Sequence, residues 1–231
     1  GLKVRGLMNA QFAVQDGTVY VLEVNPRASR TVPFVSKAIG VPLAKIAALV
    51  MAGATLEDLG FVSEIKPRHV SVKEAVFPFV RFRGVDVLLS PEMKSTGEVM
   101  GIDTNHGMAF LKSQVAAGNT LPAAGNVFLS LRDADKNAAV PLARRLVALG
   151  FTIFATEGTS TMLRDAGIPS RAVFKISAGR PNVLDMMAGN ELAWIVNTPS
   201  DGEKPMRDET RMRAEAAARG ITITTTLDGL S

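Results

Sequence analysis

The 231-residue sequence contains no cysteine and only two histidines, His69 and His106. The missing cysteines exclude disulfides, thiolate metal sites, iron–sulfur clusters and a cysteine nucleophile, and two imidazoles disfavour a histidine-rich zinc site. No apolar run approaches the roughly 18 residues of a membrane-spanning helix, and the first residues lack the layout of a signal peptide. We therefore expect a soluble, cytoplasmic protein without membrane partners.

The sequence also has no segment in which charged residues of one sign are concentrated. The chain has 26 Lys and Arg against 22 Asp and Glu, divided as 13 and 10 in residues 1–118 and 13 and 12 in residues 119–231. Nucleic-acid binding requires clustered basic residues and is not predicted. The 47% apolar content is typical of a globular chain, and the length allows one or two domains.

Two domains are expected, residues 1–118 and 119–231, because residues 119–125 have the composition of a linker. The second half alternates between strand and helix patterns, which predicts an α/β fold with a parallel sheet covered on both faces. The expected strands are 126–131, 151–155, 171–175, 192–197 and 221–225, and the expected helices are 134–148, 159–166, 182–189 and 207–219. Because Pro141 disfavours a helix interior, the first of these helices is expected to begin properly near Val140.

The first half begins with a predicted β-hairpin, residues 7–14 and 19–24 around Asp16-Gly17. A three-residue loop would pair Gln11 with Glu23, whereas a two-residue loop would shift the pairing by one residue. We prefer the first register because it gathers the polar side chains at one end. It places on the opposite face Met8, Ala10, Phe12, Val14, Tyr20, Leu22 and Val24. The other expected elements are helices at about 33–37, 42–51 and 108–117 and a strand at 70–80.

Gln11, Glu23 and Asn25 place three oxygen-bearing side chains at the polar end of this hairpin. Hard oxygen ligands suit Mg²⁺ or Mn²⁺, and Mg²⁺ in proteins is commonly shared with substrate phosphates. Arg27 and Arg30 follow and could bind such phosphates through two hydrogen bonds each. A solvated polar end of a hairpin explains the same pattern equally well.

The carboxyl ends of the expected parallel strands form a second candidate site, since ligands of open α/β sheets bind there. Hydroxyl, amide, glycine and lysine residues gather at that edge: Ser130, Lys136, Thr156, Gly158, Thr159, Lys175, Asn197, Thr198 and Thr225. Lysine charge and exposed backbone N–H groups at a helix start suit a phosphate group. One threonine at a strand end is more often a turn residue, but the convergence of several favours a site.

Several motifs resemble one known family. The run from Glu23 to Lys37, with Gln11 before it, resembles the metal-binding end of an ATP-grasp domain, and more narrowly that of carbamoyl phosphate synthetase large subunits. The segments 84–86 and 91–101 are similar to the part that follows in that family. Residues 156–159, Lys175 and 179–181 resemble its carboxy-terminal regulatory domain, which has the methylglyoxal-synthase-like (MGS-like) fold.

This resemblance covers essentially the whole chain and implies a piece of a larger subunit. Residues 1–118 would be the C-terminal lobe, of α+β type, of the second ATP-grasp half, and residues 119–231 a Rossmann-like MGS-like regulatory domain. The whole enzyme makes carbamoyl phosphate from bicarbonate, two ATP and ammonia released from glutamine by an amidotransferase small subunit. It serves pyrimidine and arginine biosynthesis, and the piece alone is expected to be inactive.

The resemblance also assigns roles to individual residues. Gln11, Glu23 and Asn25 would hold the Mg²⁺ or Mn²⁺ of ATP, and Arg27 and Arg30 would lie at its phosphates as catalytic residues. Lys136, Thr156, Thr159, Lys175 and Asn197 would bind a nucleotide effector such as UMP or IMP. Glu74 matches a residue near the site of the activator ornithine, and the regulatory domain would favour a homo-oligomer.

Two other functions remain open. The MGS-like fold also occurs in methylglyoxal synthase, a phosphate lyase, but the carboxylate base of that family is missing from the loop at residues 178–182. A non-catalytic oligomerisation module is the other alternative. Pro199 stands where the family commonly has a second threonine, and Thr222-Ile223-Thr224 stand where some relatives carry an aromatic residue of the ornithine site.

Overall fold

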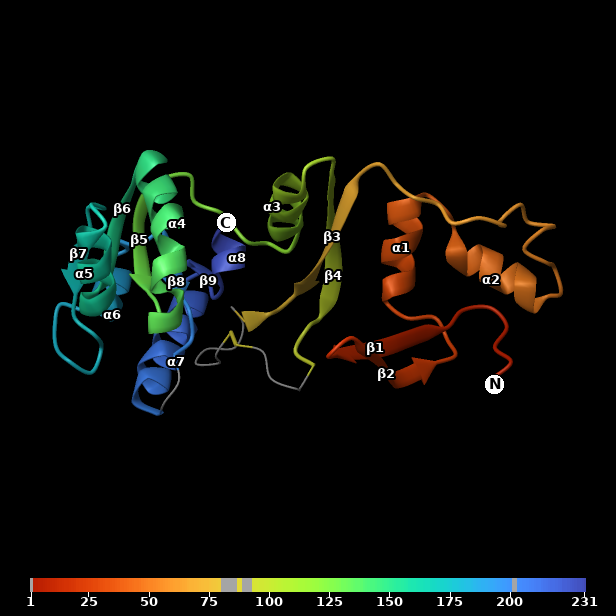
Figure 1. Ribbon diagram of the computed structural model, residues 1–231, viewed down its shortest axis with the longest axis horizontal. Helices are drawn as coiled ribbons and strands as arrows, with labels where there is room; N and C mark the ends of the chain where they lie inside the picture. The colour runs from red at the N-terminus through yellow and green to blue at the C-terminus, as the bar shows by residue number, and fades with distance from the viewer. Residues whose placement is uncertain (1, 80–86, 89–92, 201–202) are drawn as a thin grey trace. The chain divides into compact units, whose positions relative to one another are not determined.

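The computed structural model of the chain describes residues 2–79, 87–88, 93–200 and 203–231 (Figure 1). Its backbone contacts divide the chain into a first unit, Gly1–Val76 with Gly97–Gly118, and a second unit, Phe77–Thr96 with Asn119–Ser231. The division after Gly118 coincides with the start of the expected linker, whereas the described residues 77–79, 87–88 and 93–96 group with the second unit. The family-like segments 84–86 and 91–92 lie outside the described residues.

The first unit begins with a two-stranded antiparallel hairpin, β1 (Asn9–Gln15) and β2 (Thr18–Asn25). The expected three-residue loop is wrong, because Gln15 pairs with Thr18 across a two-residue turn at Asp16-Gly17. Both turn residues have positive φ, 49° and 76°, which is typical of the type I′ turns that match strand twist. Gln11 nevertheless pairs with Glu23, because a β-bulge between Gln11 and Phe12 shifts the register by one residue.

The two-residue turn also changes the faces of the hairpin between the turn and the bulge. Phe12 pairs with Val21 and Ala13 pairs with Tyr20, and directly paired residues share a face of the sheet. Val19 and Val21 therefore lie on the apolar face, and Tyr20 lies on the face of Gln11. The expected assignment is correct at the polar end, where the bulge restores the expected register, but wrong for these three residues, because the turn has two residues and not three.

Two helices follow the hairpin, α1 (Thr31–Ile39) and α2 (Leu43–Met51). Gly40 ends α1 with a left-handed φ of 72°, the conformation that favours glycine after a helix. No single helix in the described ranges is long and apolar enough to cross a membrane, although α1 and α2, bent by 110°, together pass a test of length and composition.

The rest of the first unit pairs β3 (Val70–Val76) with β4 (Gly97–Asp103) in antiparallel fashion and adds helix α3 (His106–Ala116). The expected strand at 70–80 ends early, before Pro78, which has no N–H to donate to a strand ladder. Phe77 and Phe79 instead stack on each other with ring centroids 5.1 Å apart.

The second unit is built on a five-stranded parallel sheet of order β7-β6-β5-β8-β9, which confirms the expected α/β fold. Its strands are β5 (Gly125–Ser130), β6 (Phe151–Thr156), β7 (Arg171–Val173), β8 (Trp194–Asn197) and β9 (Thr222–Thr224). Its helices are α4 (Lys136–Ala148), α5 (Glu157–Asp165), α6 (Val183–Ala188), α7 (Glu203–Ala218) and the unexpected α8 (Leu227–Leu230), with a 3₁₀ turn at Asp133–Asp135 before α4.

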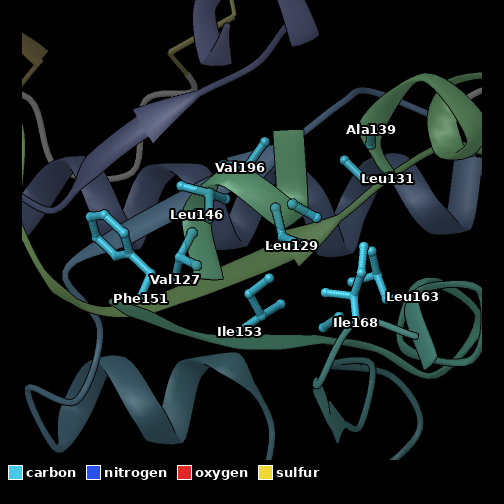
Figure 2. Packing of buried hydrophobic residues seen from close by; sticks show 12 residues of the cluster. Val127, Leu129, Leu131, Ala139, Leu146, Phe151, Ile153, Leu163, Ile168 and Val196 are labelled. Carbon is cyan, nitrogen blue, oxygen red and sulfur yellow. The ribbon is translucent and has the colours of Figure 1, made fainter. Parts of the chain in front are cut away.

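Alternate residues of the central strands point into two separate cores. Val127 and Leu129 of β5 pack with α4 and α5 in one core, which Figure 2 shows together with Ile153 of β6 and Val196 of β8. Phe128 of β5 belongs to the other core, with residues of α6 and α7. Helices thus cover both faces of the sheet, as expected for a parallel sheet whose strands are continuously apolar.

Helix α4 begins four residues earlier than expected and contains Pro141 in its interior. Pro141 has no N–H for the carbonyl of Asn137, so one intrahelical hydrogen bond is lost near the start of the helix. The buried residues Ala139, Ala143 and Leu146 lie on one side of α4 and contribute to the first core. Their burial offsets the lost hydrogen bond, which explains why the expectation from Pro141 alone was wrong.

Gly101 marks a close approach between β4 and α3 in the first unit. A Cβ atom at Gly101 would lie 1.9 Å from the carbonyl oxygen of Ala109 and 2.5 Å from the backbone nitrogen of Ser113. Ala109 and Ser113 are fully buried, so the helix backbone itself packs against the strand at this point. Only glycine permits this contact.

We predict that Gly101→Ala destabilises the first unit by about 3 kcal/mol, because α3 must move away from β4 to admit the methyl group. Gly97→Ala, on the same strand with no atom within 4 Å of the added Cβ, is the matched control. Calorimetric unfolding, with hydrogen exchange to localise the change to α3 and β4, measures the effect. Equal unfolding curves for the two variants would contradict the packing described.

Candidate functional site

A cavity of about 490 Å³ opens at the carboxyl edge of the parallel sheet in the second unit. The ends of β5 and β6, the starts of α4 and α5, the loop after β7 and one side of α7 line it. Six of the nine residues predicted for the effector site lie in its wall: Ser130, Lys136, Thr156, Gly158, Thr159 and Lys175. The structure therefore brings the core of this predicted site together.

Lys136 and Gly158 form the cationic end of the cavity. A Cβ atom at Gly158 would lie 3.2 Å from Nζ of Lys136, so the ammonium group rests against the backbone at the start of α5. The Lys136 side chain is about one-fifth exposed, and its Nζ lies 2.6 Å from Oδ1 of Asp133. Glycine at position 158 thus leaves room for a cation beside backbone N–H groups, an arrangement that suits an anion.

Hydrogen bonds hold the threonine side chains of the β6–α5 turn in place. Thr156 Oγ1 donates to Thr159 Oγ1 at 3.2 Å, and the backbone N–H of Leu131 donates to the same oxygen at 3.4 Å. Thr159 is 1% exposed, so its hydroxyl position is fixed by the surrounding structure. The turn that carries these hydroxyls is thereby tied to the end of β5.

The positive charge of the cavity affects the pKa of Asp133. The hydrogen bond from Lys136 and the positive charges of Lys136 and Lys175 lower that pKa below its usual value. Asp133 lines the cavity and is almost fully exposed, and its carboxylate pairs with the ammonium group that a phosphate would need.

Asn197, Thr198 and Thr225, the other three predicted residues, are not among the described residues that line the cavity. Asn197 and Thr198 are 0% and 2% exposed and use their side chains in hydrogen bonds to neighbouring segments. Thr225 follows β9, the strand at the edge of the sheet, with β8 between it and β5. A strand end is easy to locate in a sequence, but strand order and side-chain direction are not.

The structure also adds wall residues that the sequence did not single out. Asp208, Glu209 and Met212 of α7 line one side of the cavity together with Ser200. Asp208 Oδ2 accepts hydrogen bonds from the backbone N–H and the hydroxyl of Ser177, at 3.0 Å and 2.7 Å. The helical spacing of residues 208 and 212 was the available signal, but it does not reveal which face α7 turns to the sheet.

The remaining walls are apolar, formed by Phe128, Ile176, Val183 and Met212 with the half-exposed ring of Phe174. The cavity therefore combines a cationic, hydroxyl-rich end with apolar sides. Such a combination suits a phosphorylated molecule that carries a ring.

The hairpin site of the first unit has the predicted pairing. Gln11 lies opposite Glu23, and Asn25 Nδ2 donates to Glu23 Oε1 at 2.9 Å. This hydrogen bond turns the amide nitrogen of Asn25 toward the carboxylate and leaves the amide oxygen available to a cation. One carboxylate and two amide oxygens form a donor set that fits Mg²⁺ or Mn²⁺ shared with phosphate oxygens. Within the described residues, no group of three or more His, Cys, Asp or Glu is placed to hold a metal.

The two arginines after the hairpin differ in their surroundings. Arg27 Nη1 donates to the carbonyl of Ala28 at 3.1 Å. Arg30 Nε lies 3.7 Å from Oε1 of Glu98 on β4, and Lys73 on β3 lies 3.1 Å from the other oxygen of the same carboxylate. Glu98 thus ties Arg30, which is half exposed, to the β3–β4 ribbon.

Glu74, predicted near an activator site, lies on β3 and is partly buried. Burial raises the pKa of its carboxyl group above the usual value, and a hydrogen bond with Gln114 of α3 opposes that shift. A cationic group nearby would favour the charged form of this carboxyl.

A parallel sheet covered on both faces, with a cavity at the carboxyl ends of its strands, defines the second unit as an α/β domain of the kind that binds ligands at this edge. The comparisons with known proteins agree in both halves. Residues 138–225 match the family described as "MGS-like domain", and residues 1–59 match "Carbamoyl-phosphate synthase L chain, ATP binding domain".

Curated relatives match almost the entire chain. It is 53% identical to the carbamoyl phosphate synthase large chain of Myxococcus xanthus (strain DK1622) over 98% of this chain and 21% of the relative. The identity is 52% to that of Pasteurella multocida and 53% to that of Archaeoglobus fulgidus, each over 99% of this chain and 21% of the relative. The chain belongs to the carbamoyl phosphate synthase large-chain family and spans about a fifth of the length of these relatives.

We predict that Gly158→Ala leaves the second unit folded but weakens its binding of inorganic phosphate several-fold. The added methyl group meets only the flexible end of Lys136, so the ammonium group is displaced while the backbone stays in place. Chemical-shift titration with phosphate measures the affinity, and Gly97→Ala is the control. Unchanged phosphate affinity in Gly158→Ala would show that Lys136 does not act at this position.

Proposed function

We propose that the second unit is the nucleotide-effector domain of a carbamoyl phosphate synthase large chain and binds a nucleoside monophosphate such as UMP or IMP. The observation that carries this proposal is the convergence of Lys136, Lys175 and the β6–α5 turn in one cavity at the carboxyl edge of the sheet. A phosphate monoester carries close to two negative charges at neutral pH, and this end of the cavity offers two ammonium groups.

The phosphate would take the place that Asp133 now shares with Lys136. Two hydroxyls, of Thr156 and Thr159, and the backbone at Gly158 add hydrogen-bonding groups. The nucleoside would then extend along the apolar walls toward Asp208 and Glu209, whose carboxylates can accept hydrogen bonds from ribose or base. A volume of about 490 Å³ falls within the ordinary range of small-molecule sites.

The activity of the whole large chain is the wider part of this proposal. That enzyme would make carbamoyl phosphate from bicarbonate, two ATP and ammonia released from glutamine by a small subunit, in the cytoplasm, for pyrimidine and arginine biosynthesis. In it Gln11, Glu23 and Asn25 would hold the Mg²⁺ or Mn²⁺ of ATP, which neutralises phosphate charge during transfer. Arg27 and Arg30 would bind the phosphate oxygens, with Arg30 oriented by Glu98.

Because the chain spans about a fifth of its relatives, catalysis belongs in this proposal to the whole large chain rather than to the segment. The effector would act by favouring one of two states that differ in affinity for substrate. Glu74 is a candidate for binding the cationic activator ornithine, since an ammonium group would relieve the desolvation of its carboxylate. Self-association through the second unit is also proposed.

We predict that Lys136→Met and Lys175→Met each weaken UMP or IMP binding by about 10- to 100-fold, since each removes a charge-assisted hydrogen bond worth about 1.5–3 kcal/mol. Isothermal titration calorimetry of the chain measures the affinity. Lys66→Met, at a largely exposed lysine of the first unit, is the control. Wild-type affinity in both site variants would overturn the assignment of the effector site.

In the whole large chain, we predict that Glu23→Gln raises the Mg²⁺ concentration needed for half-maximal carbamoyl phosphate synthesis at least about 10-fold, because an amide replaces the one anionic ligand of the set. Glu64→Gln is the control, since Glu64 is largely exposed and pairs with Lys66. The measurement is the rate of synthesis as a function of Mg²⁺. An unaltered Mg²⁺ requirement in Glu23→Gln would show that the hairpin does not bind the metal ion.

A further inference from the structure

Arg213 on α7 is a fully buried cation that none of the roles described so far uses. It is 0% exposed and is among the largest fully buried side chains of the described residues. Its Nη1 donates to Oδ1 of Asn197 at 2.5 Å and lies 3.5 Å from Oε2 of Glu209, one turn earlier on the same helix. Arg213 is not itself among the described residues that line the cavity.

Burying a guanidinium group costs free energy, so packing alone does not explain why Arg213 is buried. Removing an arginine from water carries a large desolvation cost, and a buried ion pair commonly contributes little or nothing to stability relative to an apolar pair of similar volume. Buried ionic groups are better attested as devices that fix one arrangement of neighbouring groups. The question is therefore which arrangement Arg213 fixes.

The first answer is the orientation of the Asn197 amide. Arginine has only hydrogen-bond donors, so it requires the oxygen of the amide on its side. The amide nitrogen of Asn197 must then point the other way, where it donates to the carbonyl of Ser130 at 3.2 Å. Arg213 thereby determines which group Asn197 presents to the end of β5.

Ser130 begins the segment that carries Lys136 into the cavity. Its carbonyl accepts a second hydrogen bond from the backbone N–H of Thr198 at 3.1 Å, and the Thr198 hydroxyl accepts one from the N–H of Arg132 at 2.9 Å. We call residues 131–136 the cavity rim. Asn197, the last residue of β8, and Thr198, which follows it, hold the start of this rim, and Lys136 lies at its end.

Glu209 forms a second branch of the same network. Its Oε2 accepts a hydrogen bond from the backbone N–H of Ser200 at 3.1 Å, and both residues line the cavity. Arg213 is thus connected to two parts of the cavity wall. Asn197 links it to the rim, and Glu209 links it to the segment after β8.

We propose that Arg213 is a positioning residue for the effector cavity, which orients Asn197 and Glu209 so that the cavity rim presents Lys136 to the phosphate of the ligand. This inference rests on the proposed effector function and deepens it. It gives Asn197 an indirect role, as a member of the network behind the rim rather than a wall residue.

The test compares Arg213→Met, Asn197→Ala and the double variant in calorimetric titrations with UMP and with IMP. Each single variant is expected to weaken binding about 10-fold, and the double variant to weaken it no further than Arg213→Met does, because Asn197 acts through its hydrogen bond with Arg213. Arg213→Lys, which keeps a donor and a charge, is expected to recover part of the affinity. Arg219→Met is the control, since Arg219 directly follows the same helix, is partly exposed and pairs with Glu215 of that helix at 2.6 Å.

Hydrogen exchange without ligand supplies a readout that separates positioning from general destabilisation. Arg213→Met is expected to raise exchange in residues 131–136 while exchange in β6 stays unchanged. Should Arg213→Met fail to fold, Arg213→Lys and Asn197→Ala decide the question through the same titrations.

The outcomes separate this inference from the function on which it rests. If the wild-type chain binds neither UMP nor IMP, the proposed function fails. If the wild type binds and Arg213→Met binds as Arg219→Met does, the positioning role fails while the effector site stands. Losses that simply add in the double variant would also overturn it, because they would show that Asn197 and Arg213 act independently.

Discussion

The parallel pairing of β5 with β6 on one side and β8 on the other is the constraint on which the second unit depends. It buries Val127 and Leu129 in one core and Phe128 in the other, so a shift of β5 by one residue would exchange these side chains between two cores of different packing. The same pairing brings the carboxyl ends of three neighbouring strands to one edge. The cavity opens at this edge because the core that fixes the strands also fixes where their chain turns begin.

Electrostatics then distinguish this edge from an ordinary end of a sheet. Lys136 and Lys175 supply positive charge and line the same cavity, and both lower the pKa of Asp133. Asp133 balances Lys136 within the chain, so a phosphate has to replace an existing ion pair rather than fill an uncompensated charge. Behind the wall, the buried Arg213 donates a hydrogen bond to Asn197, and in its proposed role it orients groups that support the cavity.

The sequence predicted most helices and strands correctly, but it did not predict strand register or the direction in which individual side chains point. The strands of the sheet and the residues at their ends were predicted because apolar runs bounded by turn residues have a clear signature. The sequence analysis placed the start of α4 too late because proline is unfavourable inside a helix. The burial of Ala139, which favours the earlier start, could not be seen in the sequence. The buried position of Asn197 and its hydrogen bonds to Ser130 and Arg213 depend on contacts between separate segments, which no local pattern records. The bulge beside Gln11 was missed because it has no clear signature in an alternating pattern.

The most direct test of the central claim is hydrogen exchange of the chain with and without UMP or IMP. The account predicts protection at the cavity rim, at residues 156–159 and around Lys175, with no change in β1, β2 or α2. Protection at these three segments together would show that the carboxyl edge of the sheet binds the nucleotide. Binding without protection there, or protection only in the first unit, would contradict the account.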